Sequence, residues 1–95
     1  MYLKIYRIDG IEKIVAACDQ ELINKTISEG DIEITVSDKF YGTDIATEDE
    51  LIGALNRVNN ANLVGKRVIS IASKCGAISE ENCLYINGIP HIQIL

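Results

Sequence analysis

Apolar and polar residues alternate in the first segment of the chain, YLKIYRI at residues 2–8. This period of two predicts a strand with one buried face. Asp9-Gly10 comes next and is a strong signal for a two-residue turn, and the apolar run IEKIVAAC follows it directly. The first 18 residues are therefore predicted to form a β-hairpin.

The next two segments predict a short helix and then a strand. Asp19 is a suitable N-cap for the amides of QELINKT, and Gly30 can close that segment. Residues 31–37, DIEITVS, alternate without interruption, so one face of this strand should be buried while the other meets water. Such a strand is typical of an antiparallel or mixed sheet with helices on one side.

Residues 47–58, TEDELIGALNRV, give the strongest helix signal. Thr47 and Glu50 have the spacing of a capping box, and apolar residues follow at helical intervals. Residues 62–76, NLVGKRVISIASKCG, fit both the strand period and the helical period. Because the helical period fits better, we predict a helix over residues 64–75, with a strand as the alternative.

The chain ends in LYINGIPHIQIL, which predicts a closing strand, or two short strands broken at Asn87-Gly88. Together the segments predict an α+β fold. The expected sheet is small, antiparallel or mixed, with about four to five strands and two to three helices on one side. A length of 95 residues fits a single domain over residues 1–95.

The composition limits the classes of function. Fourteen acidic and nine basic residues leave a net charge of −5. This charge disfavours nonspecific attraction to nucleic acid, so no DNA partner is expected. No apolar run reaches the roughly 18 residues of a membrane span, so no membrane contact is expected. The three cysteines lack paired spacing and fit reduced thiols, which indicates a cytoplasmic location.

Pro90 and His91 are the only proline and the only histidine of the chain. Proline removes one ladder donor, so Pro90 predicts that the last strand lies at a sheet edge or at a bulge. His91 and Gln93 then share one face of this strand. The imidazole could act as a base or a ligand near neutral pH, or it merely ends a half-exposed strand.

Cys18 is the candidate nucleophile. It precedes the start of a predicted helix, where the pKa of a thiol falls, although the neighbouring Asp19 acts in the opposite direction. Pairing of Cys18 with His91 is one catalytic hypothesis, and a buried structural cysteine is the alternative we favour. Three cysteines and His91 lack the close ligand pairs of structural zinc, so neither a metal nor a cofactor is predicted.

Phe40 and Tyr41, followed by Gly42, lie in a predicted loop. Their rings could stack a base or anchor a partner, and they could equally pack under the sheet. Arg67 belongs to a small basic group on the helix predicted over residues 64–75. It would contribute to an RNA surface if it lay beside the aromatic rings, whereas a solvated helix face is the ordinary interpretation.

The segments CDQELINKTISEG, FYG, ANLVG and GIPHIQIL resemble the archaeal family called domain of unknown function family 424, over nearly the whole chain. The most specific part is the order of Asp19, Glu21 and Leu22, Phe40-Tyr41-Gly42, Asn62-Leu63-Val64-Gly65, and Pro90-His91 with Gln93. The resemblance implies an archaeal cytoplasmic protein with a small α+β domain and no established activity. The family pattern retains Pro-His, so it also implies a shared role for this pair.

These features lead to the hypothesis of a non-catalytic interaction module that docks a protein or RNA partner through the aromatic loop and the last strand. The alternative is a small hydrolase or transferase with His91 as base and Cys18, Asp19 or Asp44 as its partner. The sequence leaves the oligomeric state open. The expected binding residues are Phe40, Tyr41, Gly42, Asn62, Arg67, Pro90, His91 and Gln93.

Overall fold

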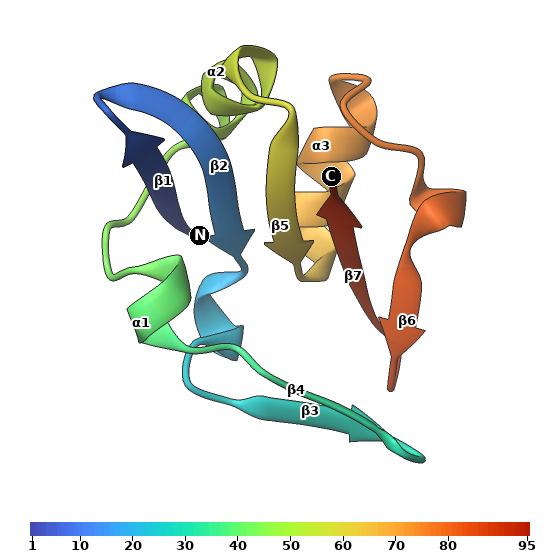
Figure 1. Cartoon of the computed structure of the whole chain (residues 1–95). Helices are drawn as coiled ribbons and strands as arrows, with labels where there is room; N and C mark the ends of the chain where they lie inside the picture. The colour runs from blue at the N-terminus through green and yellow to red at the C-terminus, as the bar shows by residue number, and fades with distance from the viewer.

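A five-stranded mixed sheet forms the centre of the computed structural model, which describes residues 1–95 (Figure 1). The strand order is β1-β2-β5-β7-β6, and the β2–β5 pair is parallel while the other pairs are antiparallel. The predicted α+β fold with a mixed sheet is therefore confirmed. The strands are β1 Tyr2–Ile8, β2 Ile11–Cys18, β5 Asn60–Val64, β6 Leu84–Ile86 and β7 Ile89–Ile94.

Two tight turns connect neighbouring strands of this sheet. Asp9-Gly10 joins β1 to β2, and Asn87-Gly88 joins β6 to β7. Their φ angles are 53° and 77° in the first turn, and 50° and 79° in the second. Positive φ at both central residues is the geometry of a type I′ turn, which matches the twist of the flanking strands. The predicted hairpin at the amino terminus and the break of the closing segment at Asn87-Gly88 are both confirmed.

Helices α2 (Glu48–Arg57) and α3 (Lys66–Lys74) cover one face of the sheet (Figure 1). α2 begins with the predicted capping box of Thr47 and Glu50, and a 3₁₀ turn at Glu80–Asn82 leads from α3 toward β6. Neither helix is long and apolar enough to span a bilayer. The core between helices and sheet consists of Met1, Val15, Ala17, Leu51, Ala54, Leu55, Ala61, Leu63, Val68, Ile69, Ile71 and Ala72.

The opposite face of the sheet is partly covered by α1 (Asp38–Tyr41) and by a second hairpin, β3 (Thr26–Glu29) with β4 (Ile32–Thr35). This hairpin confirms the strand predicted within residues 31–37, and in Figure 1 it extends below the main sheet. The molecule therefore has a core layer on each side of the sheet. The second core consists of Ala16, Cys18, Leu22, Ile27, Val36, Tyr41, Val64 and Ile86.

The helix predicted after Asp19 is wrong. The chain forms only a 3₁₀ turn at Gln20–Leu22 before it enters β3. A segment this short cannot stabilise a helix by itself, and Asp19, its predicted N-cap, binds a different helix. The Asp19 carboxylate accepts hydrogen bonds from the backbone amides of Arg67 and Val68, at 3.0 and 2.9 Å, and so caps α3.

The helix predicted over residues 64–75 is confirmed only from Lys66 onward, because β5 occupies the preceding residues. Gly65 separates the two elements with a φ of 112°. A Cβ at this position would lie 2.3 Å from Cγ of Asp19, so only glycine fits between the strand and the cap of the helix.

The expectation that Pro90 marks a sheet edge or a bulge is wrong, since β7 lies between β5 and β6 and its register with both strands is continuous. The Pro90 carbonyl accepts from the Gly65 amide at 2.9 Å, so the ring nitrogen also faces the β5 side. The last β5 residue in this ladder is Val64, which is opposite His91. Position 90 therefore needs no ladder donor, and proline is tolerated inside the sheet.

Candidate interaction surface

Asn62 lies in the middle strand, on the side of the sheet away from α2 and α3. It is opposite Ala16 on β2 and Gln93 on β7, and Ala16 is in turn opposite Lys4 on β1. Directly opposed residues of a sheet point to the same face. These four side chains therefore form one row across four strands.

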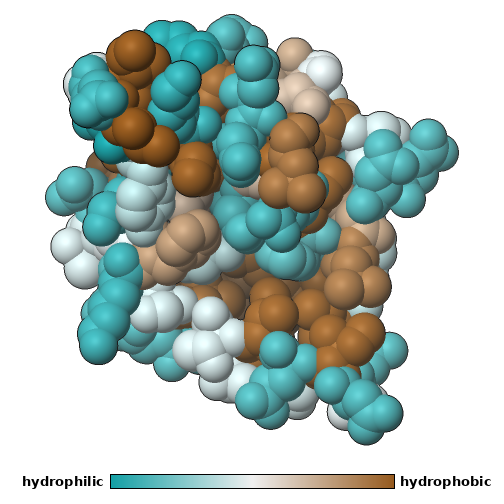
Figure 2. Space-filling view, in the orientation of Figure 1, coloured by the Kyte–Doolittle hydropathy of each residue, from teal (hydrophilic) through white to brown (hydrophobic).

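We call the exposed part of this side of the sheet the open face. Although the chain has a net charge of −5, the strands direct no Asp or Glu to this face. In Figure 2, drawn from this side, hydrophilic and hydrophobic residues are interspersed and form no single apolar patch. The polar and aromatic strand residues of the open face include Lys4, Tyr6, Asn60, Asn62, His91 and Gln93.

The side chain of Asn62 links α1 to β7. Its Oδ1 accepts a hydrogen bond from the Tyr41 hydroxyl at 3.2 Å and lies 3.0 Å from Nε2 of His91. An amide oxygen can only accept, so Nε2 carries the proton and donates. Neutral His91 then presents Nδ1 as a free acceptor, while Nδ2 of Asn62 is a free donor. A ligand on the open face thus meets an acceptor and a donor on adjacent side chains.

Burial keeps His91 in its neutral form. The side chain is half-buried, and this loss of water lowers the pKa of His91 from its ordinary value of 6.5. No carboxylate is hydrogen-bonded to the ring to oppose the effect. At neutral pH the imidazole is therefore uncharged, as its contact with Asn62 allows.

Phe40 and Tyr41 are neighbours on α1 but lie in different environments. Tyr41 is 5% exposed, and burial raises the pKa of its hydroxyl well above the ordinary value. Phe40 is 36% exposed and stacks on Tyr6 with ring centroids 5.5 Å apart. The Tyr6 hydroxyl also donates to the Phe40 carbonyl at 2.5 Å. One of the two predicted aromatic residues is therefore a surface anchor, and the other is a core residue.

Gly42 ends α1 and leads the chain from the two aromatic residues to β1. It ends α1 with a φ of 75°, and its amide donates to the Asp38 carbonyl at 2.8 Å. A Cβ on Gly42 would lie 3.4 Å from Cβ of Lys4. Its conformation brings the chain from Phe40 down to the outer edge of β1.

Pro90 and Arg67 do not belong to the open face. Pro90 is buried beside Ile69 and Lys66 of α3. Arg67 is exposed, but it lies on α3, in the helix layer on the other side of the sheet. The RNA surface that would combine Arg67 with Phe40 is therefore not formed.

Lys4 and Tyr6 are open-face residues that the sequence-based prediction missed. The ammonium of Lys4 lies 5.0 Å from the centre of the Tyr6 ring. Their alternation with the partly buried Leu3 and Ile5 showed that they share a face. Their position in one surface with Asn62 depends on the β1–β2–β5 pairing, which alternation does not reveal.

The catalytic pairs proposed from the sequence do not form. In the strand register Val64 lies between Cys18 and His91. Cys18 is fully buried, and burial together with the charge of Asp19 raises its pKa to about 11. Asp19 caps α3, and Asp44 lies at the outer edge of β1, with β2 and β5 between it and β7.

The potential metal ligands are dispersed through the fold. No three of the His, Cys, Asp and Glu side chains lie close enough together to hold a metal ion. All three cysteines are free thiols, and Cys75 and Cys83 pack against the helix-side core, away from Cys18.

Fold and surface together define a small α+β protein with two core layers and a polar, aromatic sheet face. Over residues 6–95 the chain matches the family described as protein of unknown function (DUF424), and it belongs to this family. It is also similar to the crystal structure of an uncharacterized conserved protein from Methanopyrus kandleri, with a TM-score of 0.77. The two share 20% identity, and the match covers 98% of this chain and 88% of the other, which shows a common fold. No curated protein matches the chain.

Proposed function

We propose that the protein is a non-catalytic interaction module that docks a protein partner on the open face. The observation that carries this proposal is Phe40, which is 36% exposed and stacks on Tyr6 at the border of a sheet face whose strands contribute hydrogen-bonding side chains and no Asp or Glu. Aromatic residues in such surroundings are frequent binding anchors. The complementary partner would bring an apolar side chain to Phe40 and an acidic group to Lys4.

Preorganisation of the surface supports this role. Phe40 contacts Tyr6 on one side and the edge of the Tyr41 ring on the other, with centroids 4.9 Å apart. Asn62 holds both Tyr41 and His91 in place through one oxygen atom. A surface whose side chains are already ordered loses little conformational entropy when a partner binds.

A protein partner fits this surface better than RNA does. Most RNA affinity comes from phosphates neutralised by lysine and arginine side chains. Among the strand residues with a register partner in the main sheet, Lys4 is the cation on the open face, and Arg67 lies in the opposite layer. The net charge of −5 further opposes a phosphate backbone.

Affinity capture from native cell extract tests the proposal. Wild-type protein, Phe40→Ala and Arg67→Ala are immobilised at equal density, after thermal melts have shown that all three are folded. We expect Phe40→Ala to reduce retention of a specific protein by about tenfold or more. Arg67→Ala, the matched control on the other layer, should retain that protein at the wild-type level.

Two results would contradict the proposal. Retention that is equal on wild-type protein and Phe40→Ala would show that the open face is not the binding surface. Retention that disappears after ribonuclease treatment and falls steeply with salt would identify RNA as the ligand.

A further inference from the structure

One side-chain oxygen joins three elements at the centre of the open face. Oδ1 of Asn62 accepts hydrogen bonds from the Tyr41 hydroxyl and from Nε2 of His91, so α1, β5 and β7 meet at this atom. Two hydrogen bonds occupy both lone pairs of an amide oxygen. The atoms that remain for a ligand are therefore Nδ2 of Asn62 and Nδ1 of His91.

Both of these nitrogen atoms reach the solvent. The hydrogen bonds of the two side chains within the protein are those made at Oδ1 and Nε2, so Nδ2 of Asn62 and Nδ1 of His91 have no partner. The protein buries no side-chain nitrogen or oxygen that lacks a partner, so neither atom is buried. Nδ2 is a donor and Nδ1 of the neutral ring is an acceptor. The pair thus offers one donor and one acceptor to a ligand.

The immediate surroundings of this pair are neutral. Burial alone lowers the pKa of His91, and no neighbouring charge contributes to the shift. The residues opposite Asn62 and His91 in the strand register are all uncharged: Ala16, Val64, Leu84 and Gln93.

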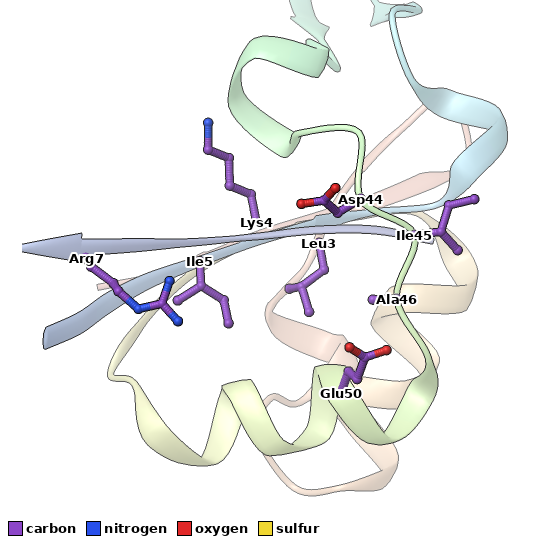
Figure 3. Close-up of a pocket in the computed structure, with 8 residues that line it drawn as sticks. All are labelled: Leu3, Lys4, Ile5, Arg7, Asp44, Ile45, Ala46 and Glu50. Atoms are coloured by element: carbon purple, nitrogen blue, oxygen red, sulfur yellow. The ribbon is translucent and has the colours of Figure 1, made fainter. Parts of the chain in front are cut away.

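Lys4 and Asp44 are charged groups at the β1 border of the open face. A groove of about 380 Å³ runs along β1, and both residues contribute to its lining. Figure 3 shows Lys4 and the Asp44 carboxylate on the side of β1 that faces away from α2. Strand β2 lies between β1 and Asn62, and it contributes Ala16 to this row. A ligand at Asn62 and His91 therefore meets hydrogen-bonding atoms rather than charges.

We propose that Asn62 and His91 bind the carboxamide of an asparagine or glutamine side chain of the partner, an inference that rests on the proposed docking of a protein at the open face. The carboxamide nitrogen donates to Nδ1 of His91, and the carboxamide oxygen accepts from Nδ2 of Asn62. Each polar atom of the pair then has a partner of the opposite kind.

Other polar groups satisfy only half of the pair. A carboxylate has no proton to donate to Nδ1 of neutral His91, and an ammonium group has no acceptor for Nδ2 of Asn62. A backbone peptide group has both atoms, but in a folded partner they are normally bonded within secondary structure. A side-chain carboxamide is free to bind both.

The pair is held in position before a ligand binds. Nε2 of His91 is already bonded to Asn62, so the ring loses little rotational freedom when Nδ1 gains a partner. Leu84, which is opposite His91 and 48% exposed, would be covered by the same partner. Exclusion of water at Leu84 strengthens the adjacent hydrogen bonds.

NMR titration with small probes tests the site without the partner. The probe is acetamide, and the control is acetate, an anion of the same shape, at equal ionic strength. At about pH 7.5 acetamide should shift the side-chain NH₂ signals of Asn62 and the ring signals of His91 along a saturable curve, with a Kd on the order of 100 mM. Acetate should bind about fivefold or more weakly, because it cannot donate to Nδ1.

Two variants on β7 separate this site from general solvent effects. His91→Phe removes Nδ1 and should abolish the acetamide shift at Asn62, which still accepts from the Tyr41 hydroxyl. Gln93→Ala, the matched control on the same strand and face, should bind acetamide at the wild-type level. Thermal melts establish that both variants are folded.

Lower pH gives the same test without a substitution. Once the ring signals show that His91 is doubly protonated, Nδ1 is a donor, and the preference should reverse from acetamide to acetate. Tyr41 is the other titratable group of this network, and it stays protonated because burial raises its pKa.

Three results would overturn the proposal: equal binding of acetamide and acetate at neutral pH, acetamide shifts that persist in His91→Phe, or adenosine bound more tightly than acetamide, which would indicate a nucleobase ligand. The capture experiment with Phe40→Ala remains a separate test. Capture that depends on Phe40 without acetamide binding would remove this inference alone. Specific acetamide binding without such capture would remove the docking proposal and leave an amide-binding site.

Discussion

At the residue scale, Asn62 determines which polar atoms of the open face are available to a ligand. One amide oxygen satisfies both the Tyr41 hydroxyl and Nε2 of His91, so the remaining polar atoms of Asn62 and His91 are directed to a ligand. An aliphatic residue here would leave the Tyr41 hydroxyl, in a 5% exposed residue, without its partner. Asn62 therefore contributes to the stability of α1 as well as to the surface.

His91 predicts a specific dependence of stability on pH. Burial lowers its folded-state pKa below the ordinary value of 6.5, so the unfolded chain takes up the proton first as the pH falls. The contribution of neutral His91 to the free energy of unfolding is complete above about pH 6.5. It decreases as the pH falls toward the folded-state pKa of His91, and it changes no further below that pKa. Urea unfolding between about pH 7.5 and pH 5 should show this decrease in the free energy of unfolding.

The variant His91→Gln is the control, because glutamine can donate to Asn62 but does not titrate. Its stability should be nearly constant over the same interval. Since the chain has one histidine, the ring resonances in an NMR titration report this pKa directly. A folded-state pKa above 6.5 would contradict the assignment of a neutral, half-buried ring.

At the element scale, the start of α3 is the most tightly constrained point of the fold. The Asp19 carboxylate is 5% exposed and binds two backbone amides of the first helical turn. Its charge also complements the positive end of the helix dipole. Gly65 allows this contact because it has no Cβ. The end of β2, the end of β5 and the start of α3 are thereby joined in one cluster.

A pair of glycine variants tests this constraint. In Gly65→Ala the new Cβ would collide with Asp19 while the residue keeps a φ of 112°. We expect a loss of about 3 kcal/mol or more in the free energy of unfolding, which combines a clash with backbone strain. Gly76→Ala has a similar φ of 82° but no atom within 4 Å of the new Cβ, so about 1 kcal/mol is expected. Equal losses in urea unfolding would show that the Asp19 contact is not the cause.

The success of the sequence-based prediction also differs between elements. The capping box of Thr47 and Glu50 and the two type I′ turns were predictable, because each signal lies within a few residues. The prediction of a helix after Asp19 was wrong, because the Asp19 carboxylate can cap any helix that begins within its reach. Its actual partners are the amides at Arg67 and Val68, which are distant in the sequence.

At the scale of the whole molecule, the sheet separates two cores that pack on its opposite faces. Val15 and Ala17 of β2 contribute to the helix-side core, whereas Ala16 and Cys18 contribute to the core under α1. Because β2 is a shared strand, loss of one core should weaken the other. We therefore expect cooperative unfolding, as is usual for domains of this size.

Thiol labelling tests the integrity of the second core. Cys18 is fully buried with its pKa raised to about 11, so it should react only when the molecule opens. Mass spectrometry after labelling near neutral pH should show Cys18 modified about a hundredfold or more slowly than the half-buried Cys75. The two rates should converge above the urea midpoint. Rapid labelling of native Cys18 below pH 8 would instead reveal an activated thiol.

Four of the eight predicted binding residues lie at the open face, and the physical reasons differ from residue to residue. Alternation along the last strand placed His91 and Gln93 on one side, and the sheet register then added Asn62 to the same surface. Whether Phe40 or Tyr41 was exposed could not be read from adjacent positions on one short helix. The packing of α1 on β2 made that choice.

The sequence by itself determined the local features: the hairpin turns, the alternating strands, the capped helix and the family. It did so because these signals arise from hydrogen bonds and dihedral preferences within a few residues. Only the tertiary structure decided that Pro90 lies inside the sheet, that Asp19 caps α3 and that Lys4, Tyr6 and Asn62 share a face. Each of these facts depends on strand order and register, which arise from packing between distant segments.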